Sequence, residues 1–173
     1  MQIMLMGIYI YSPKEKLMKE RIIGIIENVQ AKPPGALMKK TCDLVFADTG
    51  IACIFLGTST TVSAMLGNAA GGTGGAIAFY ASTQPAIDEK RKKGAGKSIG
   101  KLLAQDKENF FIKYSDIEKE KSIYKTGFFD TLFIAAQLVV HAKGKKYVFD
   151  TPCSTKNISK QIILRATGNI RVG

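Results

Sequence analysis

The residues with the clearest chemical potential form a basic run near the middle of the chain. Residues 88–97 read DEKRKKGAGK. The cations of this run are Lys90, Arg91, Lys92, Lys93 and Lys97. Clustered lysine and arginine side chains attract the phosphates of lipid head groups or of nucleic acids. We therefore predict that these residues contact an anionic membrane surface or another anion.

The glycines of the basic run, followed by Lys97 and Ser98, look like part of a phosphate-binding loop. The complete P-loop pattern needs a glycine where this chain has Arg91, and a buried strand directly before the loop. The residues before it, 88–93, are too highly charged for a buried strand. The sequence therefore predicts a flexible basic stretch here and no nucleotide-hydrolysing site.

Side chains suited to acid–base catalysis are sparse. His141 is the only histidine, which excludes any catalytic arrangement that needs two. Asp116, Glu118 and Glu120 alternate along a segment expected to be a solvated strand, and such a row makes a poor acid–base pair. We expect a protein that is not an enzyme.

The cysteines favour neither a metal site nor a disulfide framework. Cys42, Cys53 and Cys153 are odd in number and lack the CxxC spacing of zinc sites. We therefore expect no metal and no cofactor. Because disulfides mark oxidising compartments, their expected absence favours the cytoplasm.

An uncharged segment precedes the basic run. Residues 49–87 contain no Asp, Glu, Lys or Arg, and Gly67, Gly71 and Gly75 recur there at a spacing of four. On a helix these glycines form a flat stripe against which another helix can pack closely, so that self-association or a protein partner is one prediction. Residues 61–82 allow three interpretations: a loop, a packed helix or a membrane-inserted helix.

Composition limits the class of protein. The 173 residues are 46% hydrophobic and 23% charged, which suits one domain with a real core and excludes a wholly disordered chain. Only one uncharged stretch is long enough to span a bilayer, which excludes a polytopic membrane protein. The 25 Lys and Arg against 14 Asp and Glu give a net charge of +11, which attracts phosphates of any kind.

The N-terminal part predicts an amphipathic helix over residues 13–30. Ser12 and Pro13 are typical of a helix start, and residues 33–35, PPG, end the pattern. Between them, apolar residues recur at helical spacing: Leu17, Met18, Ile22, Ile25, Ile26 and Val29.

The rest of the chain is richer in strand patterns. Residues 41–47 and 51–56 predict a hairpin whose turn places Gly50 at positive φ, and residues 138–142 and 145–150 predict a second hairpin turning at Lys143-Gly144. Further strands are expected over 110–114, 117–124 and 128–135. A capped helix over 154–167, which Gly168 ends, should cover the sheet with Ile158, Ile162 and Ile163.

Two stretches resemble the pleckstrin-homology-like (PH-like) and GRAM-like domains of prokaryotic type. Residues 42–55, CDLVFADTGIACIF, resemble the opening hairpin, and residues 106–117, DKENFFIKYSDI, resemble a later strand. The Lys143-Gly144 hairpin and the helix over 154–167 match the last strands and the closing helix. The resemblance implies a small, strongly bent β-barrel that serves as a binding or scaffolding module. No binding residue carries over.

Together these patterns predict an α+β fold: a bent antiparallel sheet or PH-like β-barrel with a C-terminal capping helix, an added N-terminal helix and an inserted glycine-rich segment. The expected organisation is an N-terminal segment over 1–35, the PH-like domain over 36–167 with its insertion at 58–105, and a tail over 168–173. The expected function is non-enzymatic binding or scaffolding at the cytoplasmic membrane surface through basic residues. The alternative is a basic nucleic-acid-binding protein.

Overall fold

The computed structural model describes residues 20–57, 73–125, 136–168 and 170–172, with the backbone alone for 73–83, 153 and 172. The strands are β1 (Ile22–Ala31), β2 (Lys40–Ala47), β3 (Gly50–Gly57), β4 (Phe110–Lys113), β5 (Ile123–Lys125), β6 (Ala136–Ala142), β7 (Lys145–Thr151) and β8 (Arg171–Val172). The helices are α2 (Thr73–Gly94), α3 (Ile99–Leu103) and α4 (Lys156–Thr167), with 3-10 turns η1 (Tyr114–Asp116) and η2 (Cys153–Thr155). The fold is α+β, as the sequence predicts.

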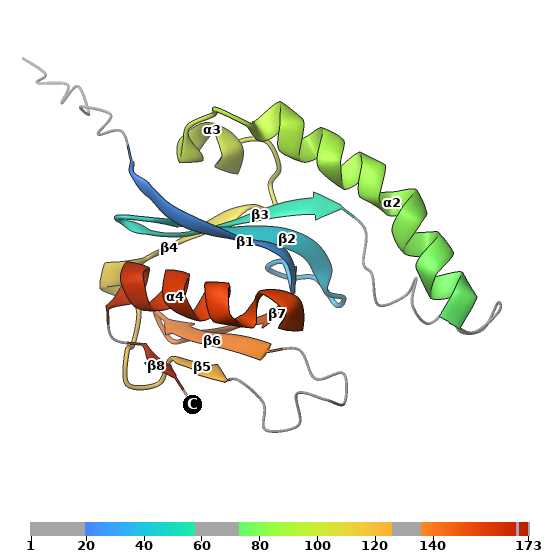
Figure 1. Cartoon of the computed structure of the whole chain (residues 1–173). Helices are drawn as coiled ribbons and strands as arrows, with labels where there is room; N and C mark the ends of the chain where they lie inside the picture. The colour runs from blue at the N-terminus through green and yellow to red at the C-terminus, as the bar shows by residue number, and fades with distance from the viewer. Residues whose placement is uncertain (1–19, 58–72, 126–135, 169, 173) are drawn as a thin grey trace, which may run out of the picture.

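The strands form one sheet in the order β4-β3-β2-β1-β7-β6-β5-β8. Strands β4 to β5 in this order pair antiparallel with one another, and the short β8 pairs in parallel with β5. Two meanders, β1–β4 and β5–β7, join where Gln30 and Ala31 of β1 pair with Asp150 and Phe149 of β7. Figure 1 shows α4 lying beside both meanders. The edge strands β4 and β8 do not pair, so the described strands form an open sheet.

The N-terminal helix predicted over residues 13–30 is wrong where the structure describes it, because Ile22–Ala31 forms β1. The pairing of β1 with β2 shifts register between Ile26 and Val29, and Asn28 between them has a φ of 57°. A β-bulge of this kind inserts an extra residue into one strand. Ile26 and Val29 therefore both face the core although they lie three residues apart. A bulged strand thus reproduces the spacing of a helix.

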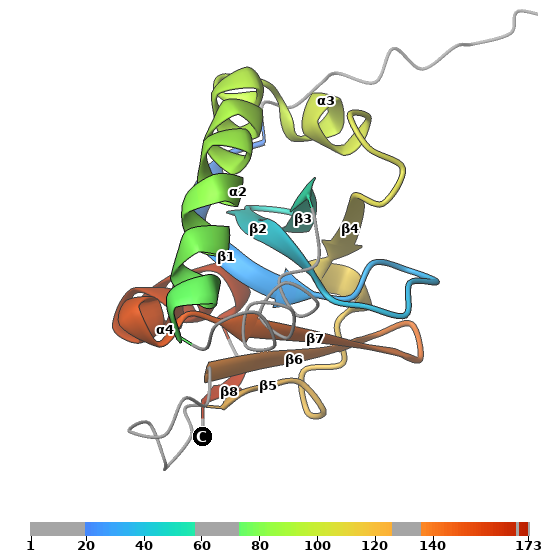
Figure 2. The same cartoon turned by 90° about the vertical axis from the view of Figure 1, so that its right-hand side faces the viewer.

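Strands β2 and β3 are buried on both faces. Their inward side chains join the main core with β7 and α4: Cys42, Leu44, Phe46, Ile51, Cys53, Phe55, Phe149 and Ile163. Their outward side chains join a second core under the helices: Val45, Ala47, Ala52, Ile54, Leu56, Ile87 and Ile99. The helices α2 and α3, which connect β3 to β4, therefore cover the outer face of the sheet (Figure 2). Burial on both faces explains why the sequence of β3 is an unbroken apolar run.

Both predicted hairpins are confirmed, but Gly50 acts in another way than expected. Its φ is not positive. A β-carbon on Gly50 would instead lie 2.3 Å from the carbonyl oxygen of Ile112, so the glycine allows the backbone of β4 to approach closely. The second turn does use positive φ angles, 50° at Lys143 and 71° at Gly144, as a two-residue type I′ turn requires.

The C-terminal helix is confirmed and ends where predicted. Gly168 has a φ of 67° and donates its N–H to the carbonyl oxygen of Leu164 at 3.1 Å. The buried stripe of α4 contains Ser159, Ile162, Ile163 and Ala166. Ile158 lies one residue off this stripe and is 62% exposed, so its predicted burial is wrong.

The strand predicted over residues 117–124 is largely absent. Ile117 makes one isolated bridge to Ala142, and β5 begins only at Ile123. Before it, the chain crosses between the two meanders: Tyr114 donates its N–H to the carbonyl oxygen of Thr49 at 3.1 Å, and Glu118 donates its N–H to that of His141 at 2.7 Å. The strand predicted over 128–135 lies outside the described residues.

Candidate functional site

The predicted basic run lies at the C-terminal end of α2 and directly after it, where cations suit the negative end of the helix dipole. Its members have different surroundings. Lys92 and Lys97 are exposed and form no ion pair with another described residue. Lys93 is also exposed, but its Nζ lies 2.7 Å from Oε1 of Glu89, one helical turn away. This bond lowers the pKa of Glu89.

Arg91 points toward the sheet and away from solvent. Its Nε and Nη2 each lie 2.7 Å from an oxygen of the Asp43 carboxylate, and Nη2 also donates to Oδ1 of Asn28 at 2.9 Å. The backbone N–H of Asn28 donates to the same carboxylate at 3.1 Å. Because Asp43 is 7% exposed, this two-pronged ion pair fastens α2 to β2 and to the bulge of β1. The hydrogen bond to Asp43 is the main cause that raises the pKa of Arg91.

Arg91 must therefore be removed from the predicted anion site. Its guanidinium is held by Asp43 within the fold, and binding another anion would leave a buried carboxylate without its partner. The sequence placed Arg91 beside lysines that face water, but a helix turns neighbouring residues by about 100° from each other. Four lysines remain of the predicted set.

The predicted glycine stripe lies mostly outside the described residues. Gly67 and Gly71 fall in residues 58–72, and only Gly75 belongs to the described part of α2. The structure therefore leaves self-association through this stripe as a prediction. Of the three interpretations for residues 61–82, the described part, 73–82, is helical, and no described helix is long and apolar enough to cross a membrane.

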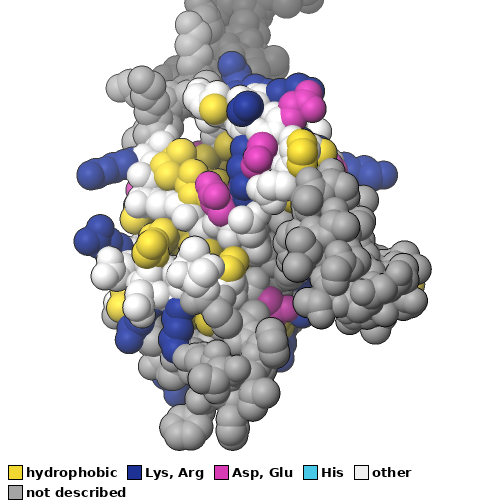
Figure 3. All heavy atoms as spheres, turned by 45° about the vertical axis from the view of Figure 1, so that its right-hand side comes forward, with side chains coloured by type: hydrophobic (Ala, Val, Ile, Leu, Met, Phe, Trp, Pro, Cys, Tyr) yellow, Lys and Arg dark blue, Asp and Glu magenta, His cyan; other side chains and the backbone are white. Residues whose placement is uncertain are grey.

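A small hollow lies between α2 and the last residues of β3, with a volume of about 150 Å³. Its residues are Ile54, Phe55, Leu56, Lys90, Lys93, Gln105, Asp106 and Asn109. It forms because β4 pairs with β3 only as far as Cys53, so the following residues have no neighbouring strand on that side. Hydrophobic side chains gather there beside basic and acidic ones (Figure 3).

The loop between β1 and β2 exposes two apolar side chains on a rigid turn. The N–H of Ala36 donates to the carbonyl oxygen of Pro33 at 3.1 Å, and Gly35 has a φ of 77°. With Pro34 before it, this is a type II turn whose residues suit its geometry. Directly after the turn, Leu37 is 90% exposed and Met38 is 47% exposed.

Exposed lysines lie on the same side of the molecule as this apolar pair. The β1–β2 loop, the β6–β7 hairpin and the connection from α3 to β4 extend toward the same side of the molecule (Figure 2). We call this side the loop face: residues 32–39, 143–146 and 104–109. Its exposed lysines are Lys32, Lys107, Lys143, Lys145 and Lys146. Among the described residues only Lys143 of these has an ion-pair partner, Asp116 at 2.9 Å.

The base of the β1–β2 loop is fixed by two further lysines. Lys39 forms an ion pair with Asp150, and Nζ of Lys40 lies 2.6 Å from Oε1 of Glu108. These two lysines thereby neutralise carboxylates near the loop face. Asp150 and Glu108 are therefore not available to pair with the exposed lysines of the face.

The sequence analysis missed the loop face. The local signal is PPGALMKK, in which two large apolar residues separate a turn from lysines. The other lysines come from segments about 70 and 110 residues further along the chain, which only the fold brings near the loop.

A second, larger groove of about 530 Å³ lies between β1, η2 and α2, with Glu27, Gln84, Asp150 and Thr155 among its lining residues. Its carboxylates already have cations near them: Asp150 pairs with Lys39, and Glu27 lies 3.7 Å from Arg91. The groove therefore shows no uncompensated charge that would select a ligand.

His141 and the carboxylates near it form no catalytic arrangement in the described part of the chain. Its backbone N–H donates to Oγ of Ser122 at 3.0 Å. Glu118 and Asp116 pair instead with Lys121 and Lys143. No three His, Cys, Asp or Glu side chains of the described residues lie together as a metal site. No protein-family model and no curated protein matches the sequence.

Proposed function

We propose that this protein is a non-enzymatic binding module of PH-like architecture that docks on anionic membrane surfaces through its loop face. The observation that carries this proposal is Leu37, 90% exposed directly after a rigid turn, on a face that also carries exposed lysines. Exposed aliphatic side chains gain free energy when they enter the boundary between lipid head groups and acyl chains. The lysines add attraction to anionic lipids, about 1 kcal/mol for each near the surface.

The strand arrangement supports the PH-like part of the proposal. Two antiparallel meanders meet at the bulged β1, and a C-terminal helix packs on β1 and β2. A bent sheet with a closing helix is what the resemblance in residues 42–55 and 106–117 implies. A closed barrel would additionally need β4 to meet the second meander. The proposal assigns the chain no reaction and no cofactor.

The alternative of a nucleic-acid-binding protein explains the lysines but not the apolar pair. Cations bind the phosphate backbone of a nucleic acid, and aromatic side chains stack on its exposed bases. Leu37 and Met38 can make neither interaction. The aromatic side chains that directly follow the loop-face segments, Tyr147 and Phe110, pack against the core, and their rings stack at 5.3 Å. The observations therefore favour the membrane.

The test is vesicle co-sedimentation at about 150 mM salt, where long-range attraction between exposed charges is screened. We expect the protein to bind vesicles of phosphatidylcholine mixed with phosphatidylserine, and to bind phosphatidylcholine alone much more weakly. The double variant Leu37→Ser, Met38→Ser should lower the partition coefficient at least about tenfold, because two side chains lose their burial. Thermal unfolding should be unchanged, since both residues are exposed.

The matched control is Ile158→Ser. Ile158 is likewise an exposed aliphatic residue, at 62%, but lies on α4, away from the loop face (Figure 2). This variant should bind vesicles as the unmodified protein does. Equal losses for both variants, or an RNA oligonucleotide that binds more tightly than the vesicles at the same salt, would contradict the proposal.

A further inference from the structure

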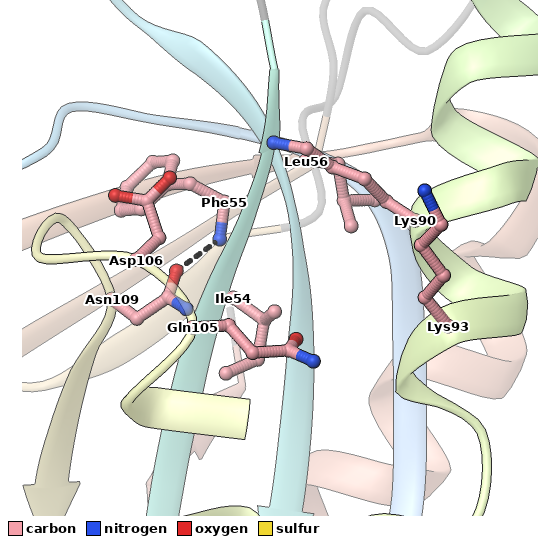
Figure 4. A pocket seen from close by; sticks show the side chains of 8 residues that line it. All are labelled: Ile54, Phe55, Leu56, Lys90, Lys93, Gln105, Asp106 and Asn109. Carbon is pink, nitrogen blue, oxygen red and sulfur yellow. Dashed lines mark hydrogen bonds between the residues drawn. The ribbon is translucent and has the colours of Figure 1, made fainter. Parts of the chain in front are cut away.

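The hollow between α2 and β3 has an apolar floor with a cation beside it. Ile54 and Leu56 form the floor from β3, while Lys90 and Lys93 line it from α2. The side chain of Lys90 extends from the helix toward β3 (Figure 4). Its Nζ has no ion pair or hydrogen bond with another described residue, in contrast to the neighbouring Arg91, which is held by Asp43.

The opposite wall is rigid because its polar groups are already bonded. Asn109 accepts the backbone N–H of Phe55 at 2.8 Å and donates to the carbonyl oxygen of Leu102 at 2.9 Å (Figure 4). Asp106 accepts the backbone N–H of Glu108 at 3.0 Å. Of the amide side chains on this wall, that of Gln105 alone has no bonding partner among the described residues. It can therefore donate to a ligand.

Charge and size restrict the ligand. Lys93 already pairs with Glu89 at 2.7 Å, so Lys90 is the lining cation without an ion-pair partner among the described residues, and one such cation suits a monoanion better than a dianionic phosphate. The volume of about 150 Å³ corresponds to about five water molecules at roughly 30 Å³ each, which leaves room for a head group and a few methylenes. The apolar floor favours methylenes over further polar groups.

We propose that this hollow binds a small carboxylate with a short alkyl chain, its carboxylate at Lys90 and its chain against Ile54 and Leu56. The inference does not depend on membrane binding, because no residue of this contact is one of the exposed lysines or apolar side chains of the loop face.

The experiment follows backbone amide shifts of the whole protein in two-dimensional NMR as hexanoate is added at about 150 mM salt. Hexan-1-ol, which keeps the chain and lacks the charge, is the matched ligand. We expect saturable shifts at residues 54–56 and 105–109 with millimolar affinity for hexanoate, and much weaker ones for hexan-1-ol. Binding that never saturates, that maps elsewhere, or that is equal for the alcohol would overturn the proposal.

Variants separate the lysine in the hollow from general positive charge. Lys90→Gln should weaken hexanoate binding about threefold to fivefold, as the loss of one partly exposed charge pair predicts. Lys92→Gln removes the same charge two positions away, where the side chain does not line the hollow, and should leave the affinity unchanged. Equal effects of both variants would overturn the proposal. Unchanged thermal unfolding of each shows that the fold is retained.

Discussion

The two lysine-rich regions of this molecule, the basic run of α2 and the loop face, differ in what surrounds their charges. In the basic run, Arg91 is bound by the buried Asp43, and Lys93 lies 2.7 Å from Glu89. In the loop face, Lys145 and Lys146 have no ion pair with a described residue, and Leu37 is 90% exposed. The denser cluster in the sequence is therefore the more neutralised one in space.

This difference teaches that adjacency along the chain is a poor guide to a binding surface. Consecutive residues of a helix point in different directions, so a run of four cations divides between solvent, a carboxylate on the same helix and the sheet below. Loops that meet at one end of a sheet can instead collect lysines from distant segments. The predictions below test this contrast.

The largest expected effect is on stability, at Arg91. Arg91→Met should lower the free energy of unfolding by about 2–4 kcal/mol, because Asp43 stays buried without its partner. The value lies toward the lower part of the range for buried pairs because the Arg91 side chain is 20% exposed. Urea denaturation measures it. Lys92→Met, one position along on the exposed side, should change stability by no more than about 0.5 kcal/mol. Similar losses for both variants would show that Arg91 does not fasten the helix.

The second effect is on membrane binding. Lys145→Gln with Lys146→Gln should lower the partition onto anionic vesicles about tenfold or more, since each lysine near the surface contributes about 1 kcal/mol. The same change at Lys92 and Lys93 of the basic run should have less than about a twofold effect. Co-sedimentation of the two double variants, which have equal net charge, decides between the regions. A larger loss for the helix pair would reverse the comparison.

A third, smaller effect tests whether ion pairing sets the charge that a membrane meets. Asp116 lies 2.9 Å from Lys143 of the hairpin. Asp116→Asn should free this lysine and raise vesicle partition about threefold to fivefold. Glu89→Gln, which frees Lys93 on α2 in the same way, should leave partition unchanged. Titration of both variants with anionic vesicles measures the difference, and an equal gain from both would mean that only total charge matters.

The smallest expected effect is on the pKa of Glu118, which lies beside the β6–β7 hairpin. Glu118 accepts hydrogen bonds from Lys121 at 2.6 Å and from the N–H of Gly144 at 3.2 Å, and these lower its pKa, the lysine most. A lowered folded-state pKa means that the stabilisation is complete above the ordinary pKa of glutamate and is lost as pH falls through the folded value. NMR titration should show this lowered pKa, and Lys121→Gln should raise it toward the ordinary value. No change in the variant would contradict the assigned cause.

Local patterns predicted the elements whose signals are short-range. The hairpin turn at Lys143-Gly144 and the helix end at Gly168 follow from residues that tolerate positive φ, so neighbouring residues suffice to place them. The same approach failed at β1. There the spacing of Ile26 and Val29 arises from a bulge at Asn28, to which Asp43 and Arg91 hydrogen-bond from elsewhere in the chain.

The candidate sites were less predictable than the fold. The lysines of the hollow, Lys90 and Lys93, belong to the predicted basic run, but their apolar floor comes from β3, more than 30 residues earlier. The loop face was not predicted at all. Leu37 is exposed, whereas Leu44, seven residues later in a predicted strand, is buried, and no strand or helix pattern marked residues 36–39 as a binding loop.

The sequence by itself determined that the protein has an α+β fold with a C-terminal helix, a strong positive charge and few groups suited to catalysis. Only the tertiary structure decided which cations face solvent and which apolar side chains stay exposed. The physical reason is that composition and periodicity act over a few residues, whereas the cost of burying a charge depends on which distant group meets it. Asp43 and Arg91, 48 residues apart, are the clearest instance.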